Sequence, residues 1–304
     1  MRPRAIPGGA ALTVAAMLAA ATVSARALAA VPIRVSALVA QNAAPYQRAL
    51  AGFKQAWGGP VASHILEFED DALARVKVEQ PALVLAVGVK AAKLALQLGV
   101  PVVYCMVLDP KANGMDAPQA VGVPLEIPPQ VQLEQLRRLL PSAKSVGLVF
   151  NPARFAHEVE EAQAVGERLS LAVVAEPATS AAQFPEALKK LVPRAEALWL
   201  LADPTVVTQD TFRLMLESAM ANHLPLLVFS DDFVRRGALM ALTPDFEGAG
   251  AEAARLARAI AEGKKMGELA PAQPRWTLVV NTTTAKALGI SFSPDTLKGA
   301  VQVQ

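Results

Sequence analysis

Short apolar runs rich in β-branched residues alternate with amphipathic stretches of helical period along most of the chain. Eight such runs predict strands, at 33–40, 61–68, 83–87, 102–106, 146–150, 171–175, 197–201 and 226–229. Most are nearly continuous apolar runs, which is typical of strands covered on both faces. Strands that alternate with helices predict parallel βαβ units and an α/β fold. Such units can form a barrel, one wide sheet or two smaller sheets.

The helical stretches carry apolar stripes that face a core. Tyr46, Leu50, Phe53 and Trp57 share one face of a stretch that begins at a proline, and proline suits a first helical turn. The same spacing recurs over 246–260, after a Pro-Asp pair suited to a helix cap. These stripes indicate packed core and not cofactor sites.

Three segments indicate crossings between two sheets. In 121–146 a strand-like stretch precedes two prolines and a helix, which we interpret as the last helix of a first lobe before a new sheet begins. Turn-rich interruptions follow at 241–244 and 270–274. Three crossings fit a chain that forms two lobes. The predicted lobes are 30–143 plus 244–273 and 144–243 plus 274–304.

Residues 1–29 have the layout of a secretory signal peptide. Two arginines precede an apolar run over 10–23, and Ala-Leu-Ala at 27–29 forms a small-residue cleavage site. The run is shorter than the ~20 residues that span a bilayer, which argues against an uncleaved anchor. No cysteine lies near the cleavage site, so a lipoprotein is not expected. We predict a protein released into the periplasm.

Charge and cysteine content exclude several classes of function. The leader contains three of the 29 basic residues and none of the 27 acidic ones, so the mature chain is close to neutral. With three Trp, two Tyr and no cluster of Lys or Arg, it lacks the features expected for binding nucleic acid or anionic membranes. Cys105 is the only cysteine, which excludes an intramolecular disulfide. Its apolar neighbours predict a packed strand thiol.

The sequence contains none of the familiar catalytic or metal-binding motifs. His64, His157 and His223 are the only histidines, and they fall in separate units without metal-ligand spacing. No H-E-x-x-H, C-x-x-C, G-x-S-x-G or P-loop pattern occurs. Gly88 stands at a strand-to-helix turn, where it serves either a tight turn alone or the backbone of a ligand cleft. We expect no enzyme activity, no metal and no cofactor.

Polar residues follow several predicted strands at the points where those strands end. Asn42, Asp109, Asn151, Asp203 and Ser230 are examples. Ligands of open α/β sheets bind beyond the carboxyl ends of the strands, so two sheets with facing carboxyl edges would bring such residues to one cleft. Asn-Pro and Asp-Pro pairs are also ordinary turn formers, and Asp and Ser are ordinary helix caps. Both interpretations stay open.

Several further segments are more specific in their order along the chain than any one of them is alone. They are 122–123, 125–129, 144–152, 197–205 (ALWLLADPT), 222–225 (NHLP), 233–246 (FVRRGALMALTPDF), 280–281 and 285–290. Together they resemble the ABC transporter substrate-binding family related to tryptophan- and phenylalanine-binding receptors, over nearly all of the mature chain. The resemblance implies a type I periplasmic binding protein fold, with two Rossmann-like lobes, parallel sheets and three hinge crossings. It also implies capture of a solute by hinge closure and delivery to a membrane permease with its ATPase.

The resemblance further implies which residues bind the solute. These residues are Asn42, Tyr46, Gly88, Met106, Asp109, Asn151, Phe155, Asp203, Thr205, Ser230, Asp231 and Asp245. Asp203 or Asp245 would receive an ammonium or hydroxyl group of the ligand, and backbone N–H groups near Gly88 would receive a carboxylate. Tyr46 or Phe155 would stack on it. The Ala-Asp-Pro-Thr-Val run at 202–206 departs from the Thr-Asp-Asn type of amino-acid receptors. The class of the solute is therefore open between an amino acid and another organic molecule of similar size.

Two other functions stay open. A periplasmic sensor or orphan receptor needs the same closure but docks on a signalling protein in place of a permease. An exported α/β hydrolase or isomerase is disfavoured by the few histidines and the absence of a nucleophile motif. We expect the protein to be a monomer, whether it serves transport or one of these two functions.

Overall fold

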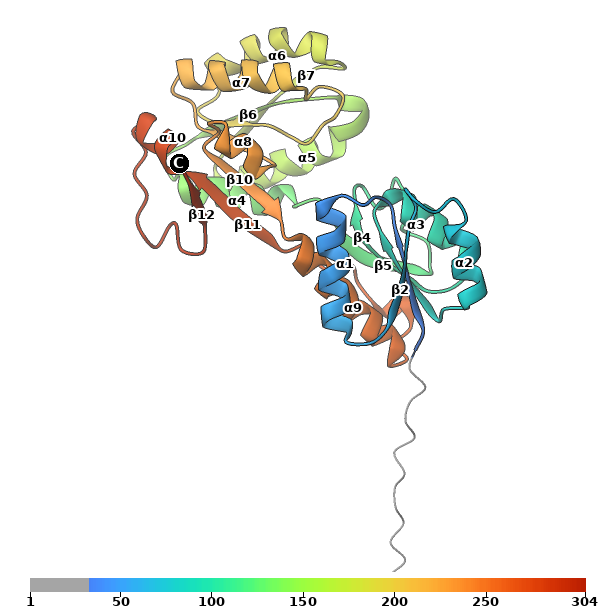
Figure 1. The fold of residues 1–304 in the computed structure, drawn as a ribbon. Coiled ribbons are helices and arrows are strands. Elements are labelled where there is room, and N and C mark those ends of the chain that lie inside the picture. Colours follow the sequence, from blue (N-terminus) through green and yellow to red (C-terminus); the bar gives the residue numbers. More distant parts are fainter. Residues whose placement is uncertain (1–32) are drawn as a thin grey trace, which may run out of the picture. The chain divides into compact units, whose positions relative to one another are not determined.

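Two β-sheets organise residues 33–304, the part of the chain that the computed structural model describes (Figure 1). The predicted signal peptide, residues 1–29, lies outside the described residues. Within 33–304, no helix has both the length and the apolar character needed to cross a membrane.

The first sheet is parallel throughout, with strand order β2-β1-β3-β4-β5. Its strands are β1 Val35–Val39, β2 Val61–Ile65, β3 Leu83–Val87, β4 Val102–Val107 and β5 Ala120–Pro124. β1, β3 and β4 are buried along their whole length, as their continuous apolar sequences predicted. The strand order reverses between β1 and β3, and ligands of open parallel sheets bind at such a reversal.

Helices cover both faces of the first sheet. α2 (Ala72–Glu79) and α3 (Val89–Ala95) pack on one face, and α1 (Ala44–Trp57) and α9 (Phe246–Ala261) pack on the other. Cys105 of β4 is buried on the side of α1 and α9, and burial raises the pKa of its thiol to about 12. The prediction of a packed strand thiol is confirmed.

α1 and α9 lie side by side in close contact (Figure 1). A Cβ atom on Gly250 would lie 1.9 Å from the backbone oxygen of Ala49, and one on Gly52 would lie 2.0 Å from that of Glu247. Both distances are far inside van der Waals contact, so the two backbones approach this closely only because each helix carries a glycine there. The contact holds α9, which comes late in the chain, against the first sheet.

The second sheet has the strand order β12-β11-β10-β9-β8-β6-β7. Its strands are β6 Ser145–Phe150, β7 Ala172–Pro177, β8 Leu198–Trp199, β9 Leu226–Val228, β10 Met240–Pro244, β11 Trp276–Asn281 and β12 Val301–Val303. The remaining helices are α4 Pro129–Leu139, α5 Pro152–Leu169, α6 Phe184–Leu191, α7 Gln209–Ala221, α8 Asp231–Arg235 and α10 Thr282–Ala287. In this sheet β10 and β11 run antiparallel, and the other strand pairs run parallel, as expected from the sequence.

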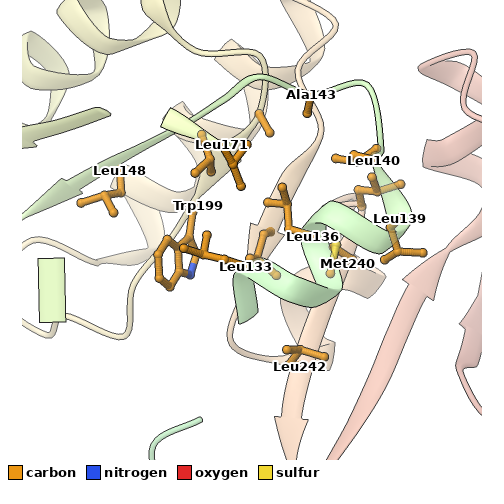
Figure 2. Packing of buried hydrophobic residues seen from close by; sticks show 14 of the residues in the cluster. Leu133, Leu136, Leu139, Leu140, Ala143, Leu148, Leu171, Trp199, Met240 and Leu242 are labelled. Atoms are coloured by element: carbon orange, nitrogen blue, oxygen red, sulfur yellow. The ribbon is translucent and has the colours of Figure 1, made fainter. Parts of the chain in front are cut away.

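Helix α4 belongs to the apolar core of the second sheet. Leu133, Leu136 and Leu139 of α4 pack in one cluster with Trp199 of β8 and Leu242 of β10 (Figure 2). α4 also packs against α5. The interpretation of α4 as the last helix of a first lobe is therefore wrong. An apolar stripe shows that a helix is buried, but it does not show against which sheet.

Residues 241–244 form most of β10 and not the turn-rich crossing expected from the sequence. Met240, Ala241 and Leu242 are buried, and Pro244 ends the strand opposite Trp276 of β11. Pro244 has no backbone N–H to donate, but the next residue, Asp245, donates to the carbonyl of Arg275, so the hydrogen bonding beside β11 continues past the proline. The short apolar run thus indicated a strand more reliably than the Thr-Pro pair indicated a turn. The Thr-Pro pair marks the end of that strand.

The order of elements gives three connections between the two sheets. They lead from β5 to α4, from β10 to α9, and from α9 to β11. Because α4 packs in the second core, we propose that the first lobe boundary lies near residue 128 and not at 143. The boundaries at 243/244 and 273/274 stay predictions.

His64 on the edge strand β2 is buried between two carboxylates. Its Nδ1 lies 2.9 Å from Glu69 Oε2, and its Nε2 lies 2.9 Å from Glu79 Oε1. Burial lowers the pKa of His64, but the hydrogen bonds and charges of the two glutamates outweigh it, so the pKa lies above 6.5. The bond to His64 also lowers the pKa of Glu69 below 4.5. This cluster ties β2 to the segment around α2.

We expect this cluster to make folding stability depend on pH. Because folding raises the pKa of His64, its stabilisation is complete below 6.5 and is lost as the pH rises through the folded-state pKa. Urea unfolding between about pH 5.5 and 8 should show this decline, and His64→Gln should remove that part of it. His157→Gln, at an exposed position of α5, should retain the decline. An unchanged pH dependence in His64→Gln would contradict the assignment.

Candidate functional site

A cavity of about 420 Å³ lies among the ends of strands from both sheets. Its lining comes from the segment after β4, the segment between β5 and α4, the helices α4 and α5, the ends of β8, β9 and β10, and Phe246 at the start of α9. The volume falls within the range of ordinary small-molecule sites, and the position beyond the strand ends is where such sites form. This cavity is the candidate site.

Aromatic side chains supply much of the wall. Trp199 is 1% exposed, and its indole N–H donates to Gln132 Oε1 at 3.1 Å. The amide of Gln132 donates in turn to the carbonyl of Ile127 at 2.7 Å, which fixes the orientation of Gln132. Phe155 and Phe229 line the cavity as half-buried rings. A wall of this kind fits an apolar or aromatic body.

The end of β4 directs one apolar side chain into the cavity. The pairing of β4 with β5 shifts register between Cys105 and Val107, and Met106 between them adopts a positive φ of 59°. Bulges of this kind re-aim side chains beside functional sites. Leu108, directly after the strand, lines the cavity and is 48% exposed. Such exposure of a large apolar side chain leaves surface that a ligand can cover.

Two carboxylates, Glu126 and Glu158, are the charged groups of the lining. Burial raises the pKa of Glu126 above 4.5, and the charges of Asp109 and Glu158 raise it further. The backbone N–H of Asp109 donates to the Glu126 carboxylate and opposes this shift. One oxygen of Glu158, Oε2, is buried and has no hydrogen-bond partner within the described part of the chain.

Two of the residues predicted from the sequence line the cavity, Phe155 and Ser230. Phe155 contributes its ring from α5. Ser230 caps α8, because its Oγ accepts the N–H of Asp232 at 3.3 Å. Both residues therefore stay candidates for contact with a solute.

Asn151, Asp203 and Thr205 lie together, but they form a closed internal network. Asp203 is fully buried and accepts the N–H of Asn151 at 2.9 Å, the N–H of Thr205 at 2.9 Å and the hydroxyl of Thr205 at 2.7 Å. The amide of Asn151 donates to Thr205 Oγ1 at 3.0 Å. This network joins the ends of β6 and β8 and positions the start of α5. Asp203 itself is not part of the cavity lining, and its contact with a ligand stays a prediction.

Asn42, Tyr46 and Gly88 lie at the ends of β1 and β3. A Cβ atom on Gly88 would lie 2.6 Å from the ring of Tyr46, and the φ of Gly88 is 95°. Its N–H donates to the carbonyl of Cys105 at 2.9 Å, which favours the tight-turn interpretation of this glycine. The N–H of Asn42 donates to a carboxylate oxygen of Glu67 at 2.8 Å. Their solute contacts stay predictions.

The other predicted positions have local roles. Asp109 has a positive φ of 41° and accepts the N–H of Ala112 at 3.0 Å. Asp231 is exposed and pairs with Arg235 at 3.6 Å. Asp245 caps α9 by accepting the N–H of Gly248 at 2.9 Å, and it borders a different hollow on the surface. Within residues 33–304 these three side chains and Met106 are not part of the cavity lining.

Sequence reasoning missed Glu126, Glu158, Gln132 and Trp199. Glu158 follows Phe155 by three positions, so the two side chains share one face of α5, and this spacing could have found it. Glu126 stands in an apolar, proline-flanked segment that was interpreted as a crossing and as part of the family resemblance, but not as part of the site. Trp199 lies inside a predicted strand, where no spacing distinguishes a core residue from a cavity wall. Among the described residues no group of three or more His, Cys, Asp or Glu side chains is arranged to hold a metal.

Comparison with known proteins places the chain in a family. Residues 69–304 match the family described as ABC transporter substrate binding protein. A tyrosine-binding protein of Clostridioides difficile (strain R20291) is 25% identical over 170 residues, which make up 55% of this chain and 49% of that protein. The chain thus spans about half the length of the curated relative that it matches.

Solved structures share the fold. A substrate-binding protein with adhesive properties from Clostridium difficile, in a ligand-free open structure, superimposes with a TM-score of 0.75 at 18% identity, covering 89% of this chain and 99% of that one. A domain from Streptococcus pneumonia in complex with L-Trp superimposes with a TM-score of 0.61 at 19% identity, with the same coverage. These likenesses confirm the type I periplasmic binding protein fold. With the family match over residues 69–304, we conclude that the chain belongs to the ABC transporter substrate-binding protein family.

Proposed function

We propose that the protein captures a small, largely apolar organic solute in this cavity and releases it to an ABC permease with its ATPase. The observation that carries the proposal is the cavity of about 420 Å³, with its aromatic wall and few polar groups. The name of the tyrosine-binding relative and the L-Trp complex of the structural relative support a solute with an aromatic body. Hinge closure of two lobes would enclose the solute. Export to the periplasm by the leader belongs to the same proposal.

The groups outside the cavity support binding without chemistry. His64 is held between two glutamates, and the pKa of Cys105 is raised to about 12 by burial. His157 and His223 are exposed. A thiol that stays protonated and a histidine in a closed cluster are poor nucleophiles and bases. We therefore propose that the protein is not an enzyme.

Leu108→Ala should weaken solute binding about tenfold, because the leucine loses its contact with the apolar body of the ligand. Leu108 is 48% exposed, so the substitution should leave the free energy of unfolding nearly unchanged. Calorimetric titration with aromatic amino acids, aromatic amines, aromatic acids and sugars provides the measurement. Val78→Ala, at an 84% exposed position of α2, is the matched control.

Equal affinity of Leu108→Ala and the parent for every bound compound would contradict the cavity as the site. Binding of no compound in the panel would count against solute capture itself. Uptake of a bound compound that stops when the permease gene is deleted would distinguish transport from sensing.

A further inference from the structure

We infer that Asn113 is a positioning residue for solute binding, because its side-chain amide holds the turn after β4 in the conformation that presents Leu108 to the cavity. The inference rests on the proposed function, since Leu108 lines the same cavity. Three features of this turn carry it. They are an exposed apolar side chain, a left-handed backbone on each side of it, and two hydrogen bonds from one amide.

Leu108 belongs to a turn and not to a strand or a helix. It lines the cavity and is 48% exposed, so its contact with a solute depends on where the turn places it. Ordering a mobile side chain during binding lowers affinity, and a side chain that is already held avoids this loss. Leu108 therefore contributes most to binding where the turn is fixed before the solute arrives.

The backbone of this turn is strained on both sides of Leu108. Met106 has a φ of 59° and Asp109 has a φ of 41°, in the left-handed region that residues other than glycine rarely adopt. Such conformations persist only where surrounding groups hold them, and they are concentrated at ligand sites. The turn therefore requires specific contacts that hold it.

The side chain of Asn113 supplies two of these contacts. Its Nδ2 donates to the carbonyl oxygen of Leu108 at 2.8 Å and to that of Asp109 at 3.1 Å. The backbone N–H of Asn113 also donates to the Asp109 carbonyl, at 3.1 Å, which keeps the amide close to both acceptors. Asn113 is not among the described residues that line the cavity. It therefore acts on the solute through Leu108 and not by contact.

Both ends of the turn are anchored to the first sheet. Val107 is fully buried, and its carbonyl accepts the N–H of Leu125 at 3.0 Å. Met115 is 4% exposed and packs in the apolar core on the side of α2 and α3. Within the turn, the carboxylate of Glu126 accepts the N–H of Asp109. Because Glu126 itself lines the cavity, its substitution would not separate positioning from contact, and the test uses the asparagine.

The test is a double-mutant cycle between Asn113 and Leu108. Calorimetry with aromatic amino acids, aromatic amines, aromatic acids and sugars identifies the compound that the parent binds most tightly, and the variants are titrated with it. Asn113→Ala should lower its affinity about fivefold, as expected for the loss of one holding hydrogen bond. In the Leu108→Ala background the same substitution should change the affinity by less than about twofold, because no leucine is left to position.

Two further variants accompany the cycle. Asn113→Asp keeps the shape of the side chain but replaces the donor group with an oxygen that faces two carbonyl oxygens, so its loss of affinity should be at least as large. Asn222→Ala removes a similar bond, from Nδ2 to the carbonyl of Ser218 at 2.8 Å at the exposed end of α7, and should keep the affinity of the parent. Urea unfolding checks that each variant is folded under the conditions of titration.

Equal affinity of the parent and both Asn113 variants would overturn the inference and leave solute capture standing. The same loss with and without the leucine would also overturn it, because the asparagine would then act by another route. Absence of binding to every compound counts against solute capture, and the inference falls with it.

Discussion

Replacing Gly250 with alanine is expected to lower the free energy of unfolding by about 2 kcal/mol. Alanine is favoured over glycine by about 1 kcal/mol in a helix, so propensity alone predicts a gain. The added methyl group, however, would lie 1.9 Å from the backbone oxygen of Ala49 and 2.7 Å from the backbone nitrogen of Phe53. Neither atom belongs to a side chain that can rotate away. α1 and α9 must separate, and the apolar contacts between them loosen.

Gly267→Ala is the matched control for this substitution. No described atom lies within 4 Å of a Cβ built on Gly267, and its φ is not positive. Equilibrium unfolding in urea, followed by circular dichroism, should show a lower midpoint for Gly250→Ala and an unchanged one for Gly267→Ala. A Gly250→Ala variant as stable as the parent would show that the two helices do not cross at this distance.

Asp203→Asn is expected to cost about 3 kcal/mol of stability. The substitution keeps the shape of the side chain but turns one acceptor oxygen into an N–H₂ donor. Asp203 is fully buried, and its two oxygens accept three protein donors, from Asn151 and Thr205. The N–H₂ group of an asparagine at this position would lie opposite at least one of these N–H or O–H donors and could not accept from it. The ends of β6 and β8 then lose the group that joins them.

Asp231→Asn provides the control, because Asp231 is exposed and loses only a surface ion pair with Arg235, worth about 0–1 kcal/mol. Urea unfolding measures both variants. Solute affinity, measured by calorimetry under conditions where Asp203→Asn is folded, should change little, because Asp203 does not line the described cavity. A large loss of affinity in that folded variant would restore the ligand role expected from the sequence.

The sequence predicted the strands best where their surroundings are simplest. β3 begins and ends as expected, because a run buried on both faces must be apolar at every position. The apolar stripe of a helix does not show which other element of the fold the helix packs against. α4 carries a clear stripe, yet its fit to Trp199 and Leu242 depends on residues that come 60 or more positions later. β10 was missed because its short run ends in a Thr-Pro pair that resembles a turn.

The candidate site was less predictable than the fold, for a physical reason. Polar residues at strand ends serve both turns and ligands, and here Asn151 and Asp203 bond to the protein itself. Phe155 and Ser230 lie where the rule for strand ends expects them. Glu126 and Glu158 are part of the lining because distant segments meet around one space. The spacing of residues along the sequence says little about which distant segments meet around a cavity.

The place of α9 in the chain determines when the first sheet can be completed. β5 is synthesised by residue 124, but α9, which shares one face of its sheet with α1, begins at Phe246, after most of the second sheet. Until then α1 alone covers that face, and part of its apolar surface stays uncovered while more than a hundred further residues are synthesised. Contacts so distant in sequence form slowly, and unpaired apolar surface favours aggregation meanwhile. Completion of the first sheet therefore depends on a helix that follows most of the second sheet, so the order of the elements couples the folding of the two sheets.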